Sequence, residues 1–233
     1  PDDLMSRNAI EDGYRLILNT ERHLADVPFA SFFNLDLLSL ANVKYFVSRD
    51  RLTHPDLTAI REMPKAWNEL TTLERVKTNL RANFFGRKQV FIYENKKVLP
   101  RFFLAAKFQA LETDAEILRR IGAEPASVLR HTVFLNSRDL PEGMPAALTP
   151  GGEGNVVLKT YSPDEIILEI DSLAPRILFT AISFNPAWRA YVDGAPVALF
   201  PADHAFMGLL VPGGRHRVVL RYEPSYKFSN PLL

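Results

Sequence analysis

Asp203 and His204 form the most polar pair within an otherwise apolar stretch near the C-terminus, and Phe206 follows them closely. A carboxylate and an imidazole on one loop can hydrogen-bond the hydroxyls of a sugar or contribute to a divalent-ion site. A metal would need further ligands, and the five histidines show no i, i+4 pairing or other short spacing. We therefore predict that Asp203 and His204 bind a glycan, with no metal and no cofactor.

Aromatic side chains could add stacking to such a site, because the apolar face of a sugar packs on an aromatic ring. Trp188 alternates with Ala190 and Val192 along a predicted strand, which favours a place in the core. Tyr191 has the opposite phase and Tyr226 falls in a loop, so both are better surface candidates. The predicted ligand-binding set is therefore Tyr191, Asp203, His204 and Tyr226.

Other carboxylates have simpler structural explanations. Asp193 stands before Gly194, where a tight hairpin turn favours Asp followed by Gly. Glu165, Glu169 and Asp171 lie near one another, as a glycosidase acid pair would, but such pairs need a defined separation across a cleft. Glu169 and Asp171 alternate with apolar residues, which indicates the solvated face of a strand. We predict no catalytic residue in this chain.

Composition excludes several further classes of function. The net charge of +1 leaves no basic excess to neutralise a nucleic acid, so no nucleic-acid partner is expected. The absence of cysteine excludes disulfides, thiolate catalysis and thiolate metal sites. Four scattered basic residues could neutralise a lipid-linked phosphate if the fold gathers them: Arg15, Arg22, Lys44 and Arg101.

The pattern along the chain predicts an α+β fold that is predominantly β. Residues 1–140 read as a mixed α and β region, with helices over much of residues 1–40 and capping boxes at Thr71/Glu74 and Thr113/Glu116. A helix is expected to end at Gly86, and a strand is expected after Pro100. The strands predicted at residues 89–93 and 101–106 are expected to be neighbours. Residues 128–135 are predicted to form a further strand.

Residues 141–153 are rich in Pro and Gly and are predicted to be a linker. Residues 154–226 then carry alternating apolar runs separated by turns, including Asp193-Gly194 and the stop at residues 212–214. This region is predicted to be an antiparallel β-sandwich, jelly-roll or immunoglobulin-like. Whether the two regions pack as one unit is left open by the pattern.

The last quarter of the chain contains long matches to a known family pattern, P-x-W-x-A-x-V-D-G, V-P-x-G-x-H-x-V and R-Y-x-P. These are here Pro186, Trp188, Ala190 and Val192-Asp193-Gly194, then Val211-Pro212, Gly214, His216 and Val218, then Arg221-Tyr222 and Pro224. Asn42-Val43-Lys44-Tyr45 and Leu99-Pro100-Arg101 match in the same order upstream. The chain thus resembles the bacterial YfhO membrane proteins over about residues 40 to 225.

The resemblance implies a parent that is a many-span membrane glycosyltransferase using a polyprenyl-phosphate sugar. It implies that this chain is a domain on the extracytoplasmic face of a bacterial cell membrane, partnered by the membrane-spanning part of the same polypeptide. The chain has no apolar run approaching the roughly 18 residues that a span needs. Both chain ends are expected to face the membrane, with Tyr226, Phe228 and the apolar Pro231-Leu232-Leu233 at the interface.

The sequence therefore favours a non-catalytic accessory domain that positions an acceptor glycan or a lipid-linked sugar. Two alternatives stay open: a purely structural module of a membrane protein that binds no ligand, and an autonomous glycan hydrolase with Asp203 or Glu169 as its acid.

Overall fold

The computed structural model describes residues 34–49, 51–62, 65, 67–85, 90–149, 152 and 154–224. The chain divides into two compact units. We call Tyr14–Leu99 the small unit and Pro100–Leu233, with Pro1–Gly13, the sandwich unit. Several predictions fall outside the described residues: those for the N-terminal helix, Arg15, Arg22, Tyr226, Phe228 and the end Pro231–Leu233.

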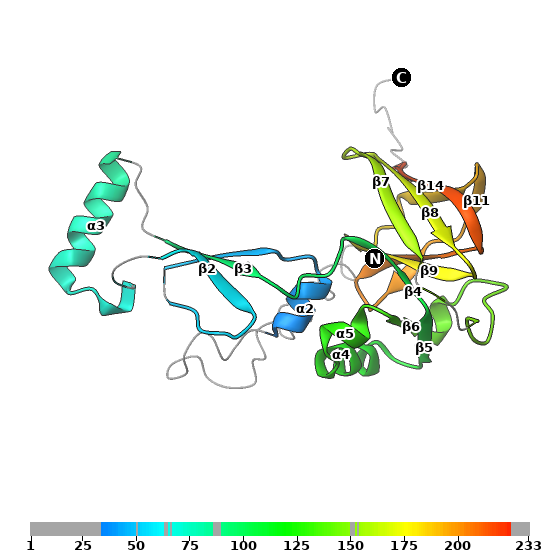
Figure 1. Ribbon diagram of the computed structural model, residues 1–233, viewed down its shortest axis with the longest axis horizontal. Helices are drawn as coiled ribbons and strands as arrows, with labels where there is room; N and C mark the ends of the chain where they lie inside the picture. The colour runs from blue at the N-terminus through cyan, green and yellow to red at the C-terminus, as the bar shows by residue number, and fades with distance from the viewer. Residues whose placement is uncertain are drawn as a thin grey trace, which may run out of the picture. The chain divides into compact units, whose positions relative to one another are not determined.

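Two antiparallel sheets make up most of the sandwich unit (Figure 1). The strand order is β11-β10-β14-β8-β7 in the first sheet and β12-β13-β9-β4 in the second. The predicted α+β fold with predominantly β structure is confirmed. The strands are β4 (Phe102–Ala105), β7 (Asn155–Tyr161), β8 (Glu165–Ser172), β9 (Arg176–Ser183), β10 (Trp188–Val192), β11 (Ala195–Val197), β12 (Phe200–Ala202), β13 (Phe206–Val211) and β14 (Gly214–Tyr222).

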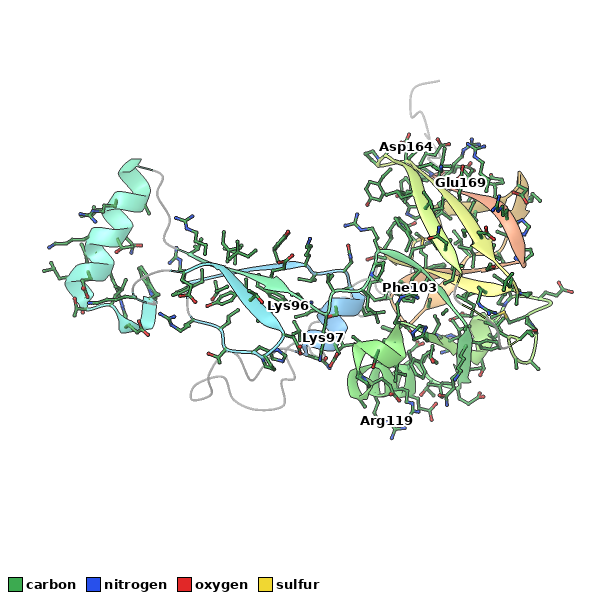
Figure 2. All side chains as sticks on the ribbon, in the orientation of Figure 1. Lys96, Lys97, Phe103, Arg119, Asp164 and Glu169 are labelled. Atoms are coloured by element: carbon green, nitrogen blue, oxygen red, sulfur yellow. The ribbon has the colours of Figure 1, made fainter. Side chains whose placement is uncertain are left out.

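Alternating side chains of both sheets form one shared apolar core. Val192, Leu209, Val218 and Leu220 are buried there, as the alternation predicted. Trp188 packs against this core but is only partly buried, so its predicted burial holds in part. The opposite face of the four-stranded sheet also carries buried side chains. Phe103 of β4, labelled in Figure 2, is one of them. Its ring stacks on that of Phe179 in β9, with ring centroids 4.6 Å apart.

A parallel β-α-β element completes the sandwich unit. Strands β5 (Lys107–Leu111) and β6 (Thr132–Asn136) are parallel neighbours, and helices α4 (Asp114–Ala123) and α5 (Ala126–Leu129) lie between them in sequence. The predicted capping box at Thr113 and Glu116 opens α4 with both reciprocal hydrogen bonds. The strand predicted over residues 128–135 begins only at Thr132, because Pro125 starts a short helix that includes Val128 and Leu129.

The small unit contains helix α2 (Leu35–Leu40), strands β1 (Tyr45–Ser48), β2 (Leu57–Arg61) and β3 (Phe91–Asn95), the 3-10 turn η2 (Trp67–Glu69) and helix α3 (Thr72–Phe85). Its three strands are ordered β1-β3-β2, and one sheet face packs on a core of Leu52, Phe91 and Tyr93. The predicted pairing of β3 with the strand after Pro100 is wrong, because β4 pairs with β9 of the sandwich unit. Within the described ranges, no helix has the length and apolarity required to cross a membrane.

Candidate functional site

The turn between β12 and β13 places Asp203 and His204 in an unusual backbone conformation. Ala202 pairs with Phe206, so residues 203–205 close the hairpin. Asp203 and His204 have φ values of 46° and 70°, in the left-handed region. Non-glycine residues adopt this region rarely, and Asp is among those that tolerate it best. From this turn both side chains reach the β-α-β element, Asp203 at Phe134 of β6 and His204 near Asp114 of α4.

Asp203 is joined to β6 by a pair of hydrogen bonds. Its Oδ1 accepts from the backbone N–H of Phe134 at 2.7 Å, and its own N–H donates to the carbonyl of Phe134 at 2.9 Å. The residue is 1% exposed, and Oδ2 has no hydrogen-bond partner among the described residues. Burial raises the pKa of Asp203 to about 8, although the Phe134 amide acts in the opposite direction. The carboxyl is therefore protonated near neutral pH, which removes the cost of a buried charge.

His204 connects this turn to the start of helix α4. Its Nδ1 lies 3.9 Å from Oδ1 of Asp114, and its side chain is 13% exposed. The Nε2 atom is buried and has no hydrogen-bond partner in the described part of the chain. Buried polar atoms usually have a hydrogen-bond partner. The β12–β13 turn is unusual because the adjacent residues Asp203 and His204 each carry a buried polar atom that has no such partner in the described part of the chain.

Asp114 is the first residue of α4 and is held by two groups at the end of β6. The amide of Asn136 donates to Oδ1 at 2.8 Å, and Arg138 Nη2 donates to Oδ2 at 2.6 Å. Burial opposes ionisation of this carboxyl, but the hydrogen bond from Asn136 and the charges of Arg138 and His204 outweigh it and lower its pKa. The positive end of the α4 dipole acts in the same direction. Asp114 is therefore an anion at neutral pH.

These five residues, Asp114, Asn136, Arg138, Asp203 and His204, are called the polar cluster below. They come from the start of α4, the end of β6 with the following turn η3 (Ser137–Asp139), and the β12–β13 turn. Arg138 is 60% exposed and Asp114 is 37% exposed, so the cluster reaches the surface on this side. It presents guanidinium donors beside a carboxylate acceptor, a combination that suits neutral polyols. No group of three or more residues suited to hold a metal ion occurs among the described residues.

Only half of the predicted ligand-binding set is found in this cluster. Asp203 and His204 belong to it, whereas Tyr226 lies outside the described residues. Tyr191 lies on β10, where its hydroxyl is 3.4 Å from Glu223 Oε1 and the guanidinium of Arg221 lies 5.9 Å from its ring centre. Arg221 lies on β14 of the five-stranded sheet, and Glu223 directly follows that strand. The assignment of Tyr191 and Tyr226 to a glycan site stays a prediction.

Sequence reasoning did not select Asp114, Asn136 and Arg138. The capping box at Thr113 and Glu116 predicts where α4 starts, so it also predicts that Asp114 is the first residue of this helix. Nothing local links it to His204, because the two are distant in the chain and meet only through tertiary packing.

The turn at Asp193 and Gly194 is confirmed, and it forms a second interaction that the sequence did not reveal. Both residues have positive φ, 52° and 87°, as a two-residue hairpin of the primed type requires. Asp193 Oδ2 lies 2.6 Å from Nδ1 of His216, and Oδ1 accepts from the N–H of Arg217 at 2.8 Å. The carboxylate thus joins the hairpin to β14.

The carboxylates of β8 lie on a solvated face, as predicted. Glu169 and Asp171 are exposed and pair with Lys159 and Arg215, each at 2.8 Å, on the neighbouring strands. Figure 2 shows Glu169 along β8 and Asp164 at the β7–β8 turn. Cross-strand ion pairs of this kind stabilise a sheet surface modestly and do not form a catalytic dyad.

Of the four basic residues proposed to gather around a phosphate, the structure describes Lys44 and Arg101, and each of these two has a partner of its own. Lys44 pairs with Glu94 at 3.4 Å in the small unit. Arg101 donates to the hydroxyl of Tyr161 at 2.8 Å in the sandwich unit, and its guanidinium lies 5.2 Å from the same ring centre.

The fold and the polar cluster define a β-sandwich module with a polar surface site. Over residues 133–228 the chain is similar to a family described as bacterial membrane protein YfhO, whose model matches these residues. The match runs from β6 through β14 and covers less than half of the chain. It supports the resemblance read from the C-terminal motifs. Comparisons with curated proteins and with solved structures gave no match.

Proposed function

We propose that this chain is a non-catalytic, extracytoplasmic accessory domain of a polytopic membrane glycosyltransferase, and that it positions an acceptor glycan. The similarity to a bacterial membrane protein family supports the membrane setting. The glycosyltransferase parent and the extracytoplasmic face follow from the motif resemblance. The accessory role follows from the ion-paired, solvent-facing state of the exposed carboxylates on β8, which leaves them unsuited to act as an acid pair.

The polar cluster is the observation that carries the glycan-binding part of the proposal. Sugar hydroxyls both donate and accept hydrogen bonds, so they bind best where fixed donors and acceptors alternate. Asp114 is fixed by Asn136 and Arg138, and its carboxylate and the Arg138 guanidinium both reach the surface. Because these groups already hold one another in place, a ligand would lose little further side-chain entropy on binding.

Binding to an array of bacterial cell-envelope polysaccharides and their fragments tests this proposal. We expect the purified chain to bind at least one glycan class, and Arg138→Ala to lose that binding. Arg215→Ala is the matched control, because Arg215 is an exposed arginine that also pairs with an aspartate. A chain that binds no glycan on the array, or an Arg138→Ala variant that binds as the unchanged chain does, would contradict the proposal.

A purely structural module is the second candidate, favoured by a specific observation. Asp203 hydrogen-bonds to both backbone groups of Phe134 and so fastens the β12–β13 turn to β6. In that case the polar cluster serves only the fold, and glycan binding is absent. The third candidate, a hydrolase with Asp203 or Glu169 as its acid, is not favoured. Asp203 is 1% exposed and cannot reach a glycosidic oxygen, and Glu169 is paired with Lys159 on a solvated strand face.

A further inference from the structure

Helix α3 of the small unit carries an apolar surface of its own. Leu73, Val76 and Leu80 follow one another at i, i+3 and i+7, which places them on one face of the helix. They are 64%, 50% and 50% exposed. An amphipathic helix of a globular protein normally buries this face against its core. Here the described residues leave at least half of each of the three side chains exposed, so their apolar area is available to another surface.

The beginning of α3 is fixed without help from that face. The N–H of Thr71 donates to Oε2 of Glu74 at 2.8 Å, and the N–H of Glu74 donates to Oγ1 of Thr71 at 3.3 Å, a reciprocal capping box. Lys65 Nζ lies 2.7 Å from Glu74 Oε1. The hydrogen bond from Lys65, with those from Thr71, lowers the pKa of Glu74 to about 2. The helix is thus anchored at its N-terminus while the apolar face remains exposed.

The charges on α3 are complementary to an anionic surface. Lys77 and Arg81 follow Leu73 by four and eight residues, so they lie along one flank of the apolar face, and both are exposed. Arg75 lies over the ring of Trp67, 5.9 Å from its centre. Glu74 is the only acidic residue of the helix, and Lys65 pairs with it. The helix therefore combines an apolar face with a net basic charge.

We propose that α3 binds an anionic lipid bilayer, lying in the plane of the membrane with Leu73, Val76 and Leu80 at the boundary of headgroups and acyl chains. A 14-residue helix is too short to span a bilayer but long enough to lie in its interface. Lys77 and Arg81 extend their charges toward lipid phosphates beside the apolar face. This inference concerns the small unit and goes beyond the proposed function, because it needs no glycan.

Cosedimentation of the full chain with lipid vesicles tests the proposal. We expect the chain to pellet with vesicles of phosphatidylglycerol and phosphatidylcholine in equal parts, and not with phosphatidylcholine alone. Added salt should release it, because headgroup attraction is screened. A combined Leu73→Gln, Val76→Gln and Leu80→Gln variant should lose more than about tenfold in affinity, because three apolar side chains no longer enter the interface.

Two further variants separate apolar from electrostatic contributions. Lys77→Gln with Arg81→Gln should weaken binding to the anionic vesicles while removing no apolar side chain. Leu173→Gln is the matched control, since Leu173 is 87% exposed but lies in the sandwich unit between β8 and β9. It should bind as the unchanged chain does. All substituted positions are solvent-exposed, so circular dichroism should show unchanged secondary structure.

Three results would overturn the proposal. The first is failure of the unchanged chain to pellet with anionic vesicles. The second is equal binding by the triple glutamine variant. The third is a stable dimer in sedimentation velocity that the triple variant dissociates, because the face would then be covered by a second copy of the chain. Loss of glycan binding by Arg138→Ala has no bearing on any of these results, so the two proposals fail independently.

Discussion

His216 lies with Nδ1 2.6 Å from Oδ2 of Asp193 and with Nε2 3.2 Å from the carbonyl oxygen of Gly213. Both partners are oxygen acceptors, so both ring nitrogens donate only when the imidazole carries two protons. The doubly protonated form is therefore favoured in the folded chain. The hydrogen bond to Asp193 is the main cause of the raised pKa of His216, and the Gly213 carbonyl adds to it.

The first prediction follows from that shift. Because the folded-state pKa of His216 lies above its ordinary value of 6.5, its contribution to stability is complete below 6.5 and is lost as pH rises through the folded-state pKa. Asp193→Asn keeps a residue that tolerates the turn conformation but removes the charge. We expect this variant to lower the pKa of His216, measured by NMR titration of the ring protons, and to flatten the fall in unfolding free energy above pH 6.5. An unchanged pKa of His216 would contradict the prediction.

Local signals predicted several elements that the structure contains. The turn at Asp193-Gly194 and the capping boxes at Thr71 and Thr113 depend on residues within four positions of one another, so sequence spacing was enough. The pairing of β4 with β9 depends on strands far apart in the chain, and nothing in either strand specifies the other. The apolar run after Pro125 was ambiguous for the same reason, because short apolar segments fit a strand or a helix equally well.

The polar cluster shows the same division between local and tertiary information. Asp203 and His204 stood out as polar residues in an apolar stretch, so the sequence was enough to select them as candidate site residues. Asp114 joins them only because the β-α-β element packs its helix start against the β12–β13 turn. A buried Asp203 with a raised pKa could not be predicted, because burial is set by the packing of all surrounding elements and not by neighbouring residues.

The second prediction concerns the charge state of Asp203. Its folded-state pKa of about 8 exceeds its ordinary value of 3.8, so the folded chain binds more protons than the unfolded chain between these values. Stability from this group is therefore complete below pH 3.8 and declines as pH rises toward 8. Asp203→Asn keeps the acceptor for Phe134 and cannot ionise. Urea denaturation should find the variant more stable than the unchanged chain at pH 8 and should find a smaller dependence on pH.

Asp203→Ala separates the hydrogen bond from the titration. It removes the acceptor of the Phe134 amide and should lower the unfolding free energy by about 1–3 kcal/mol at acidic pH. If Asp203→Asn is as destabilised as Asp203→Ala at every pH, the carboxyl is not neutral in the folded state and the prediction is wrong.

The third prediction concerns Gly208 on β13. A Cβ at this position would lie 2.6 Å from the Phe200 ring and 3.1 Å from the Ala202 Cβ on the neighbouring strand. Gly208→Ala should therefore lower the unfolding free energy by about 1–3 kcal/mol through overpacking. Gly152→Ala is the control, since its nearest contact would be Leu173 at 4.0 Å. Thermal denaturation measures both, and equal melting temperatures for the two variants would rule out the close packing described here.

The last prediction concerns Arg176, a buried arginine at the start of β9. The residue is 1% exposed, and its Nη1 donates to the carbonyls of Thr149 and Pro175 at 3.0 and 2.8 Å. Its Nη2 donates to the carbonyl of Gly152 at 3.3 Å. Thr149 and Gly152 both belong to the segment predicted as a linker, residues 141–153. The Arg176 guanidinium hydrogen-bonds both of them to the start of β9. Several backbone acceptors therefore depend on one side chain.

Arg176→Met fills much of the same volume but leaves these carbonyls without a donor. We expect it to lower the unfolding free energy by about 1–3 kcal/mol, because the buried side chain at this position no longer makes its three hydrogen bonds to Thr149, Pro175 and Gly152. Arg176→Lys retains a charge and three donors, so it should lose less. Hydrogen exchange should also speed up at the amides of Thr149 and Gly152 in the Met variant, because these residues lose their hydrogen bonds to Arg176. If Arg176→Met is as stable as Arg176→Lys and exchange in this segment is unchanged, the carbonyls do not depend on the guanidinium and the segment is held by its other contacts.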